Sequence, residues 1–268
     1  MAEISLGKEV AYIDTYTPDL LFPIPRQQSR DSLGIAADQL PFTGIDIWNA
    51  YELSWLNPKG KPQVACAQFR FPCESAAIIE SKSFKLYLNS LNQTAFTDRA
   101  ELQAQIAKDL SNCVGATVQV FIHDVDAGNT FSQLQGLCLD DIDISISHYT
   151  PDPDLLRNAG QKVEETLYSH LLRSLCPVTA QPDWASVEIA YTGSSIDHAG
   201  LLQYLIGYRQ HQEFHEQCVE RIFSDISLRC QPEQLSVRAF YTRRGGLDIN
   251  PTRSTRTLVP VNIRLNRQ

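Results

Sequence analysis

The chain has 268 residues, of which 43% are hydrophobic and 20% are charged, and its formal net charge is −8. This length allows one large folded domain or two ordinary ones, and the composition argues against intrinsic disorder. The acidic balance argues against direct binding to nucleic acid, because such binding depends on the neutralisation of phosphates.

The first half of the chain predicts an α+β unit. Residues 1–44 are expected to be irregular, because prolines interrupt them. Residues 45–55 alternate between apolar and polar as a half-buried strand does, and 64–71 follow a Pro/Gly turn as a second strand. The rest of this unit, 45–150, is predicted as a helix through 84–91, a helix from Asp98 to about Cys113, and strands at 116–123 and 142–148.

The second half, 151–268, predicts the same order again. An extended or ambiguous segment ends at Cys176, and a strand covers 187–191. The remaining elements are a helix that Asp197 can cap and that reaches about Gln210, a helix over 213–228, and strands at 235–241 and 258–265. Two α+β units with antiparallel sheets are therefore expected. A Rossmann domain is not, because the chain has neither βαβ alternation nor GxGxxG.

Polar residues gather where the first strand pair gives way to a helix: Glu80, Ser81, Lys82 and Ser83. Backbone N–H groups at a helix start are unpaired and can hold an anion. A carboxylate there can accept paired hydrogen bonds from a guanine-like edge. The alternative is an ordinary capped surface helix.

Cys176 stands before Pro177, and Asp183 follows in a Pro-Asp-Trp segment. A buried cysteine is more often a small hydrophobe than a nucleophile. With an acid and a histidine nearby in space, however, Cys176 would be an activated thiolate. Spacing along the sequence leaves both interpretations open.

His215 and Glu216 stand in the first turn of the second predicted helix, where the helix dipole is positive. Residue 219 is Val, so the HExxH pattern of zinc proteases is excluded. The alternative is an acidic first turn that only complements the dipole.

The last 33 residues carry seven arginines, no lysine and one acid, Asp248, which gives a local charge of 7 − 1 = +6. Arginine forks match phosphate oxygens in pairs, and glycines such as Gly245 allow a close approach of the backbone. Arg243 and Arg244 therefore suggest a phosphorylated ligand. The alternative is a solvated basic edge.

The N-terminus lacks the basic start and apolar run of a secretory signal, and no stretch approaches the roughly 18 apolar residues of a membrane span. The seven cysteines are scattered and include no CxxC pair, so neither a disulfide framework nor a zinc knuckle is indicated. A cytoplasmic protein without membrane contact is expected.

Taken together, these segments resemble the NADPH-dependent 7-cyano-7-deazaguanine reductases of queuosine biosynthesis, in their long, two-unit form. The signature of that family runs Glu, Ser or Leu, Lys, Ser or Ala, a hydrophobe, Lys, Leu or Tyr, and an aromatic, and Glu80–Tyr87 matches it at every position. The segments 176–184, 214–221 and 241–251 are also similar to the family.

The resemblance implies two tandem units of the tunnelling fold, each built strand-strand-helix-helix-strand-strand, and a homodimer. It also implies reduction of a 7-deazapurine nitrile to an aminomethyl group with two NADPH, without a metal, for tRNA modification. The signature lies in the first half of the chain and Cys176 in the second, so the active site is expected between the two halves.

The resemblance assigns a role to each matching residue. Cys176 is expected to attack the nitrile and form a thioimidate, Asp183 to protonate the nitrile nitrogen, and His215 to assist proton transfer. The remaining assignments are the substrate contacts Glu80, Ser81, Lys82, His215 and Glu216, and the NADPH contacts Lys82, Ser83, Arg244 and Gly245, with Arg243 as a supplement.

Two other functions remain open. A GTP cyclohydrolase-like hydrolase of the same fold needs a zinc site, but Cys73-Glu74 lacks the histidine pair that follows in that family. A non-catalytic purine-binding module would keep Glu80 and Glu216 but would have no use for Cys176.

Overall fold

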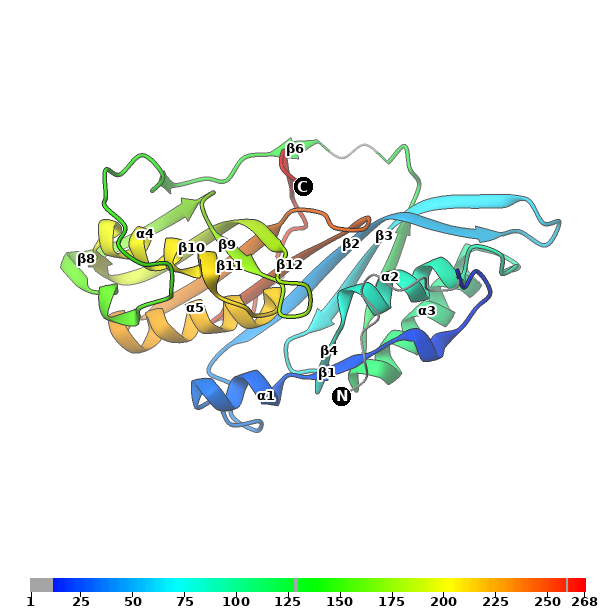
Figure 1. Cartoon of the computed structure of the whole chain (residues 1–268), viewed down its shortest axis with the longest axis horizontal. Helices are drawn as coiled ribbons and strands as arrows, with labels where there is room; N and C mark the ends of the chain where they lie inside the picture. The colour runs from blue at the N-terminus through cyan, green and yellow to red at the C-terminus, as the bar shows by residue number, and fades with distance from the viewer. Residues whose placement is uncertain (1–11, 128–129, 259) are drawn as a thin grey trace. The chain divides into compact units, whose positions relative to one another are not determined.

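The computed structural model describes residues 12–127, 130–258 and 260–268 (Figure 1). The chain divides into two compact units, and each unit is assembled from three separate segments. The first unit takes the described residues of Met1–Gln28, Asp46–Asn129 and Arg243–Ile249, and the second takes those of Ser29–Ile45, Thr130–Thr242 and Asn250–Gln268.

The first unit is built on a sheet with the strand order β5-β3-β2. Strand β3 pairs antiparallel with β5, from Cys66 opposite His123 to Arg70 opposite Gln119. A separate two-stranded sheet pairs β1 with β4, also antiparallel. The strand bounds are β1 Pro23–Pro25, β2 Thr43–Leu56, β3 Pro62–Pro72, β4 Ala77–Ile79 and β5 Gln119–His123.

Helices α2 (Ser81–Ser90) and α3 (Arg99–Val114) bury their apolar faces against this sheet in one core. The Phe84 ring meets those of Trp48 and Phe69 nearly edge-on, with centroids 5.4 and 4.9 Å apart. Such aromatic pairs add stabilisation beyond the area that they bury. Helix α3 ends at Gly115, whose φ of 71° is a conformation that glycine adopts without strain.

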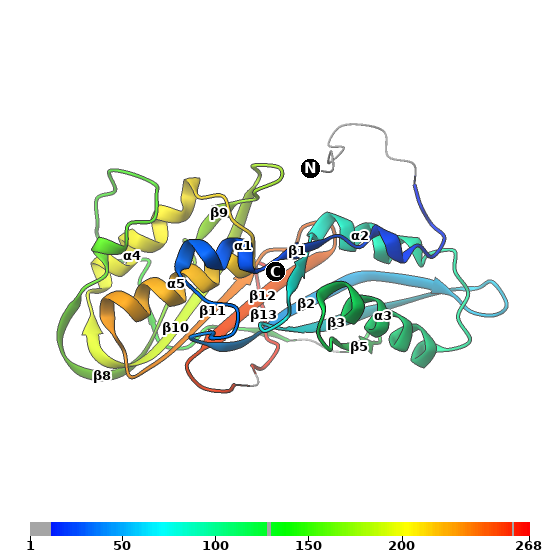
Figure 2. The ribbon, with the colours of Figure 1, turned by 90° about the horizontal axis from the view of Figure 1, so that it is seen from below.

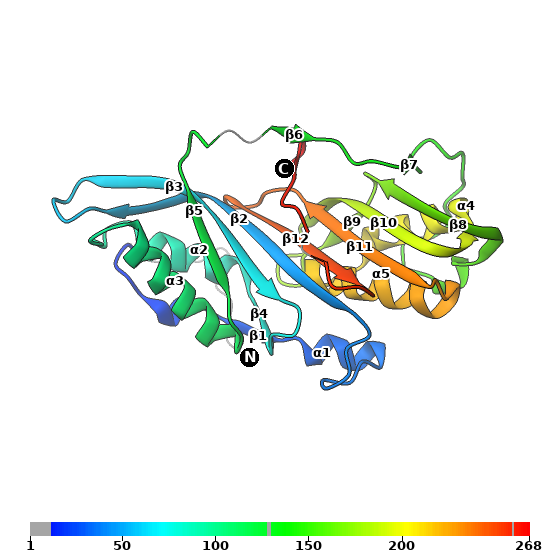
Figure 3. The same cartoon turned by 180° about the vertical axis from the view of Figure 1, so that it is seen from behind.

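The second unit has the strand order β12-β11-β10-β8-β7, with β9 paired to one end of β10 (Figure 3). Strand β10 pairs antiparallel with both β8 and β11, and β11 pairs antiparallel with β12. The strand bounds are β6 Phe131–Ser132, β7 Leu137–Cys138, β8 Asn158–Ser169, β9 Arg173–Leu175, β10 Pro182–Ile196, β11 Gln234–Tyr241, β12 Leu247–Ser254 and β13 Arg264–Leu265.

Helices α4 (His198–Ile206) and α5 (His215–Cys230) lie on one face of the sheet of the second unit (Figure 2). The carboxylate of Asp197 accepts a hydrogen bond from the backbone N–H of Ala199, so the predicted cap of the first of these helices is confirmed. The short helices are α1 Gln27–Arg30 and the 3-10 turns η1 Pro18–Leu20, η2 Asp31–Leu33, η3 Pro153–Leu155 and η4 Gly207–Gln210.

A buried cluster of charges ties the N-terminal part of the second unit to α5. Glu220 accepts hydrogen bonds from Arg30 at 2.7 and 2.9 Å and from Arg253 at 2.8 and 3.0 Å. All three side chains are at least 96% buried. Both guanidinium groups also lie over the ring of Phe42. Two cations thus share one anion in the core, an arrangement that is stable only while every member is present.

The α+β class with antiparallel pairing is confirmed, as are the helices at the two predicted places in each half. The strand expected at 142–148 is wrong. Its isoleucines at 142, 144 and 146 are half-buried, but the segment has no ladder partner. The alternation of apolar and polar residues therefore reflects burial of one side of this segment rather than strand pairing. The strand-strand-helix-helix-strand-strand order of the first half lacks its last strand.

The strand expected at 258–265 is also wrong in extent. Among the described residues of that range only Arg264–Leu265 form a strand, and residue 259 lies outside the described residues. Strand β12 went unpredicted because its sequence alternates only as far as Asn250 and continues with Pro251 and polar residues, although all eight of its residues are buried. No helix in the described parts of the chain is both long and apolar enough to cross a membrane.

Candidate active site

Cys176 lies in the turn that joins β9 to β10. Its backbone N–H donates to the carbonyl of Gln181 at 2.9 Å, and the N–H of Ala180 donates to the carbonyl of Cys176 at 2.9 Å. Within the strands, Ser174 stands opposite Asp183. Cys176 follows β9 directly, and Asp183 is the second residue of β10, so both lie at the turn end of the hairpin.

The other side of β9 is fixed by the backbone that leads into α5. The N–H of Leu175 donates to the carbonyl of His211 at 2.8 Å, and Leu175 forms a parallel bridge with Gln212. Helix α5 begins at His215. The turn with Cys176 and the start of α5 are thus held to the same short stretch of chain.

Asp183 and His215 form a pair. The imidazole Nε2 lies 3.3 Å from Asp183 Oδ2, and the two side chains are 13% and 3% exposed. Glu216, the next residue on α5, is 2% exposed. A carboxyl group and an imidazole at this distance are a combination that general acid–base catalysis uses. The structure therefore brings together Asp183 and His215, which lie 32 positions apart in the sequence.

The sequence did not indicate a further group of residues around this pair. The ring of Tyr241 stacks on that of His215, with centroids 3.7 Å apart and planes 12° apart. The Cys218 thiol lies beside the hydroxyl groups of Tyr241 and Ser174, and burial raises the pKa values of Cys218 and Tyr241. Both groups therefore stay neutral near pH 7. The i+3 spacing of Cys218 from His215 was a usable signal, whereas no pattern pointed to Tyr241.

In the first unit, the start of α2 is closed by its own cap. The Glu80 carboxylate accepts hydrogen bonds from the backbone N–H groups of Lys82 at 3.0 Å and Ser83 at 2.7 Å. The Ser83 hydroxyl donates to the Glu80 carbonyl and accepts from the N–H of Phe22. The expectation that these amides are unpaired and hold an anion is therefore wrong, because Glu80 satisfies them. Ser81 and Lys82 are half-buried at this helix end.

Replacing Glu80 with alanine is expected to lower the free energy of unfolding by about 1–2 kcal/mol, because two backbone donors lose their acceptor. Chemical denaturation measures this change. Glu74→Ala is the matched control, since Glu74 is exposed, and surface changes of that kind stay within about 0.5 kcal/mol. Equal stabilities for the two variants would contradict the capping role.

The turn between β11 and β12 lies next to α2 in the same unit. Gly245 and Gly246 have φ values of 58° and 79°, which side chains other than glycine rarely adopt. A Cβ on Gly245 would meet only Lys85 Cγ, at 3.9 Å. Arg243 lies 4.4 Å over the ring of Tyr51, and Arg244 is exposed. Cationic side chains and an open glycine backbone thus adjoin one another, which fits a ligand that carries phosphate.

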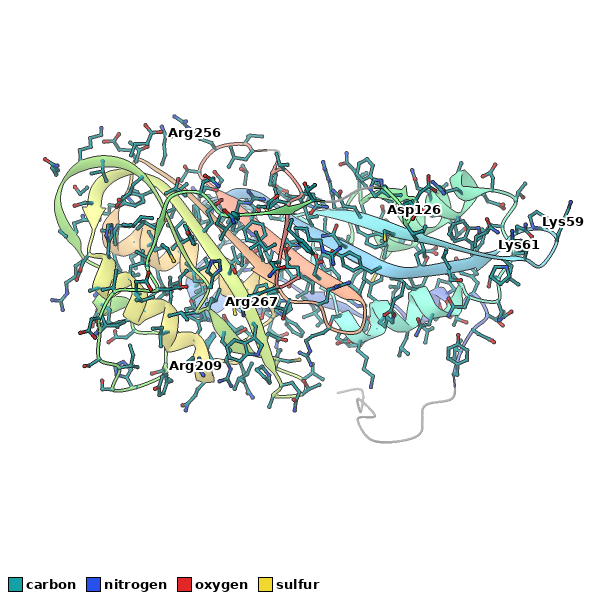
Figure 4. All side chains as sticks on the ribbon, turned by 90° about the horizontal axis from the view of Figure 1, so that it is seen from above. Lys59, Lys61, Asp126, Arg209, Arg256 and Arg267 are labelled. Carbon is teal, nitrogen blue, oxygen red and sulfur yellow. The ribbon has the colours of Figure 1, made fainter. Side chains whose placement is uncertain are left out.

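The other arginines of the C-terminal stretch do not form one basic patch. Arg253 is buried on Glu220, and Arg238 donates to the carbonyl of Val261 and lies 3.7 Å from Glu188. Arg256 and Arg267 are exposed and lie at separate places on the second unit, as Figure 4 shows. The net charge of this stretch is therefore larger than the charge that could act on one bound anion. Only two of the seven arginines, Arg243 and Arg244, lie at the glycine turn.

No group of three or more histidine, cysteine, aspartate or glutamate side chains that could hold a metal ion occurs among residues 12–127, 130–258 and 260–268. Cys73, from the Cys-Glu segment considered for zinc, is fully buried in the first unit.

Comparison with known proteins gives a consistent assignment. The family described as "Nitrile reductase, 7-cyano-7-deazaguanine-reductase N-term" matches residues 12–122, and the family described as "QueF-like protein" matches 182–259. The NADPH-dependent 7-cyano-7-deazaguanine reductase of Azoarcus sp. (strain BH72) is 57% identical over 252 residues, which are 93% of this chain and 90% of the relative. The chain belongs to the NADPH-dependent 7-cyano-7-deazaguanine reductases.

Another reductase of this family, from Dechloromonas aromatica (strain RCB), is 57% identical over 253 residues, which are 93% of this chain and 89% of the relative. A crystal structure of an apo archaeosine synthase QueF-Like matches with 14% identity and a TM-score of 0.32, over 37% of this chain and 99% of that one. The family resemblance expected from the sequence is therefore confirmed, on the strength of the two reductases.

Proposed function

We propose that this chain reduces the nitrile of 7-cyano-7-deazaguanine to an aminomethyl group, with two NADPH consumed per base. The product serves queuosine modification of tRNA. One observation carries the proposal within the fold: the Asp183–His215 pair lies beside the hairpin turn that holds Cys176. Relatives that are 57% identical are named for this substrate and this reductant.

Cys176 acts as the nucleophile. Its thiolate adds to the nitrile carbon, the C–S bond forms as one C–N π bond opens, and the nitrogen takes a proton, which gives a thioimidate. Covalent attachment divides one difficult reduction into easier steps. The half-exposed turn leaves the sulfur accessible to a ligand.

Asp183 and His215 supply the proton. Their side chains are 3.3 Å apart and almost buried, so a proton can pass from them to the nitrile nitrogen away from bulk water. Glu216, which is buried at the same helix start, is the acceptor for donors on the edge of the base. Glu80, Ser81 and Lys82 remain candidate contacts to the base.

Lys82, Arg244 and Gly245 are the proposed NADPH contacts, with Arg243 beside them, and Ser83 shapes the helix start. NADPH held by these residues would supply the two hydrides, one for the thioimidate and one for the imine that remains after sulfur departs. Overall, one nitrile, two NADPH and two protons are converted to one amine and two NADP⁺. In this proposal, Lys82 and Arg244 bind the phosphates of NADPH, and Gly245 keeps the turn between β11 and β12 open.

Arg244→Ala is expected to raise the KM for NADPH by about tenfold or more, since one charge-assisted hydrogen bond contributes about 1.5–3 kcal/mol. The KM for NADH should change less if this side chain binds the 2′-phosphate. Initial rates with both nucleotides measure the difference. Arg256→Ala removes an exposed arginine of the second unit and serves as the control. Unchanged NADPH kinetics in the Arg244 variant would count against the assignment.

The reaction itself is tested by following NADPH absorbance with 7-cyano-7-deazaguanine. We expect two NADPH oxidised per base, and without NADPH a mass increase of the intact protein by one base. Binding with neither adduct nor oxidation would favour a purine-binding module. Metal-dependent hydrolysis of GTP, with zinc in the purified protein, would favour the cyclohydrolase-like alternative.

The same proposal includes tandem units of the tunnelling fold, a homodimer, a cytoplasmic location and no direct contact with nucleic acid. In support of the fold, the second half of the chain runs β8-β10-α4-α5-β11-β12, which is the strand-strand-helix-helix-strand-strand order when the short β9 is set aside. Sedimentation of the purified chain with and without tRNA tests the assembly and the absence of binding.

A further inference from the structure

The ring of Tyr241 stacks against the ring of His215. The two rings are nearly parallel, 12° apart, with centroids separated by 3.7 Å. Tyr241 is fully buried and ends β11, where it stands opposite Ala185 on β10. Asp183, the partner of His215, lies two residues before Ala185 on the same strand. The stack and the acid–imidazole pair therefore belong to one packed group.

The position of Tyr241 is fixed from several directions. Its carbonyl accepts a hydrogen bond from Gln268 Nε2 at 3.1 Å, and the following N–H, of Thr242, donates to the Trp184 carbonyl at 2.8 Å. The hydroxyl group lies beside the Cys218 thiol in the interior. A fully buried ring whose backbone is held from two sides is a rigid surface for a neighbour to pack on.

The orientation of the His215 ring depends on such a surface. The terminal torsion of histidine is broad, so a single contact between Nε2 and Asp183 leaves the ring free to turn about that contact. The stack removes this freedom and with it fixes the direction of Nδ1, which is buried and has no hydrogen-bond partner among the residues that the structure describes.

We propose that Tyr241 is the positioning residue for His215, and that its ring, rather than its hydroxyl group, keeps the imidazole aligned with Asp183 for delivery of the proton to the nitrile nitrogen. This inference rests on the proposed function. It predicts that loss of the ring slows formation of the covalent adduct while leaving binding of the base largely intact, because Tyr241 acts through another side chain.

The test compares Tyr241→Phe with Tyr241→Leu. Rapid-quench mass analysis gives the rate of adduct formation with 7-cyano-7-deazaguanine in the absence of NADPH, and calorimetry in a Cys176→Ala background gives the affinity for the base without covalent reaction. Tyr241→Leu should slow the adduct about 10–100-fold and change the affinity less than about threefold, the range of a misplaced catalytic group. Tyr241→Phe, which restores a ring, should stay within about threefold of the unsubstituted protein.

Tyr208→Leu is the matched control. Tyr208 is equally buried in the second unit and meets His211 edge-on, at 77° and 5.3 Å, but the imidazole of His211 has no part in the proposed chemistry. This variant should lose stability without a comparable loss of adduct rate. If Tyr241→Leu does not fold, Tyr241→Met supplies the same comparison with an unbranched side chain.

The outcomes distinguish failure of the proposed function from failure of the proposed role of Tyr241. An unsubstituted protein that forms no adduct overturns the proposed function. A normal protein together with a Leu or Met variant that reacts at the normal rate overturns the role of Tyr241. Equal losses in Tyr241→Phe and Tyr241→Leu would assign the effect to the hydroxyl group and would also overturn the proposal as stated.

Discussion

Replacing Cys176 with alanine is expected to lower turnover of 7-cyano-7-deazaguanine by about a thousandfold or more and to abolish the covalent adduct. Alanine has no nucleophile, and removal of the attacking group from an enzyme that works through a covalent intermediate costs rates on this order. The residual rate should not be restored by raising substrate concentration, because the proposed base contact, Glu216, is unchanged. NADPH oxidation and the mass of the intact protein measure the two effects.

The matched control is Cys113→Ala. Cys113 is also partly accessible, but it belongs to α3 in the first unit, and burial raises the pKa of its thiol. This variant should keep its activity within about twofold, as surface changes far from a reacting group do. A Cys176→Ala protein that still turns over substrate at more than a few per cent of the normal rate would remove Cys176 from the mechanism.

Glu220→Gln is expected to have the largest effect on stability, a loss of about 3–5 kcal/mol in the free energy of unfolding. The change is nearly isosteric, so the loss is electrostatic. Arg30 and Arg253 remain in the core, but the anion that both of them bind is gone. Urea denaturation of the full chain, read out by circular dichroism, measures the midpoint and slope.

An exposed ion pair provides the comparison. Lys162 and Glu233 also form an ion pair in the second unit, but their side chains are 62% and 58% exposed. Glu233→Gln should therefore change stability by less than about 1 kcal/mol. A similarly small effect of Glu220→Gln would mean that water or the remaining neighbours compensate the two arginines, and the buried cluster would not explain how α5 is held.

The sequence predicted much of the local structure. Residues 45–55 and 64–71 carried the alternation of half-buried strands, and Asp98 and Asp197 marked helix starts that the structure confirms. These features depend on neighbours a few positions away, so a local pattern is sufficient to predict them. The same method failed at 142–148, because alternation reports which side of a segment is covered and says nothing of a pairing partner.

Some features of the candidate site could likewise be predicted from the sequence, and others could not. Cys176, Asp183, His215 and the Glu80–Tyr87 signature were found from the sequence because motifs preserve residue types at fixed spacings. The sequence left both an anion site and an ordinary capped helix open at Glu80, and the hydrogen bonds from Lys82 and Ser83 to its carboxylate show the cap. The flat contact between His215 and Tyr241 was not accessible, because 26 positions separate them and no short motif includes both.

The sequence by itself determined the family, the candidate side chains of the site and the helices that carry several of them. Only the tertiary structure decided that Asp183 faces His215, that Tyr241 lies under the imidazole, and that three separate segments make up each unit. The physical reason is that strand register and side-chain packing join residues through space, at a free energy that depends on the whole core rather than on neighbours in the chain.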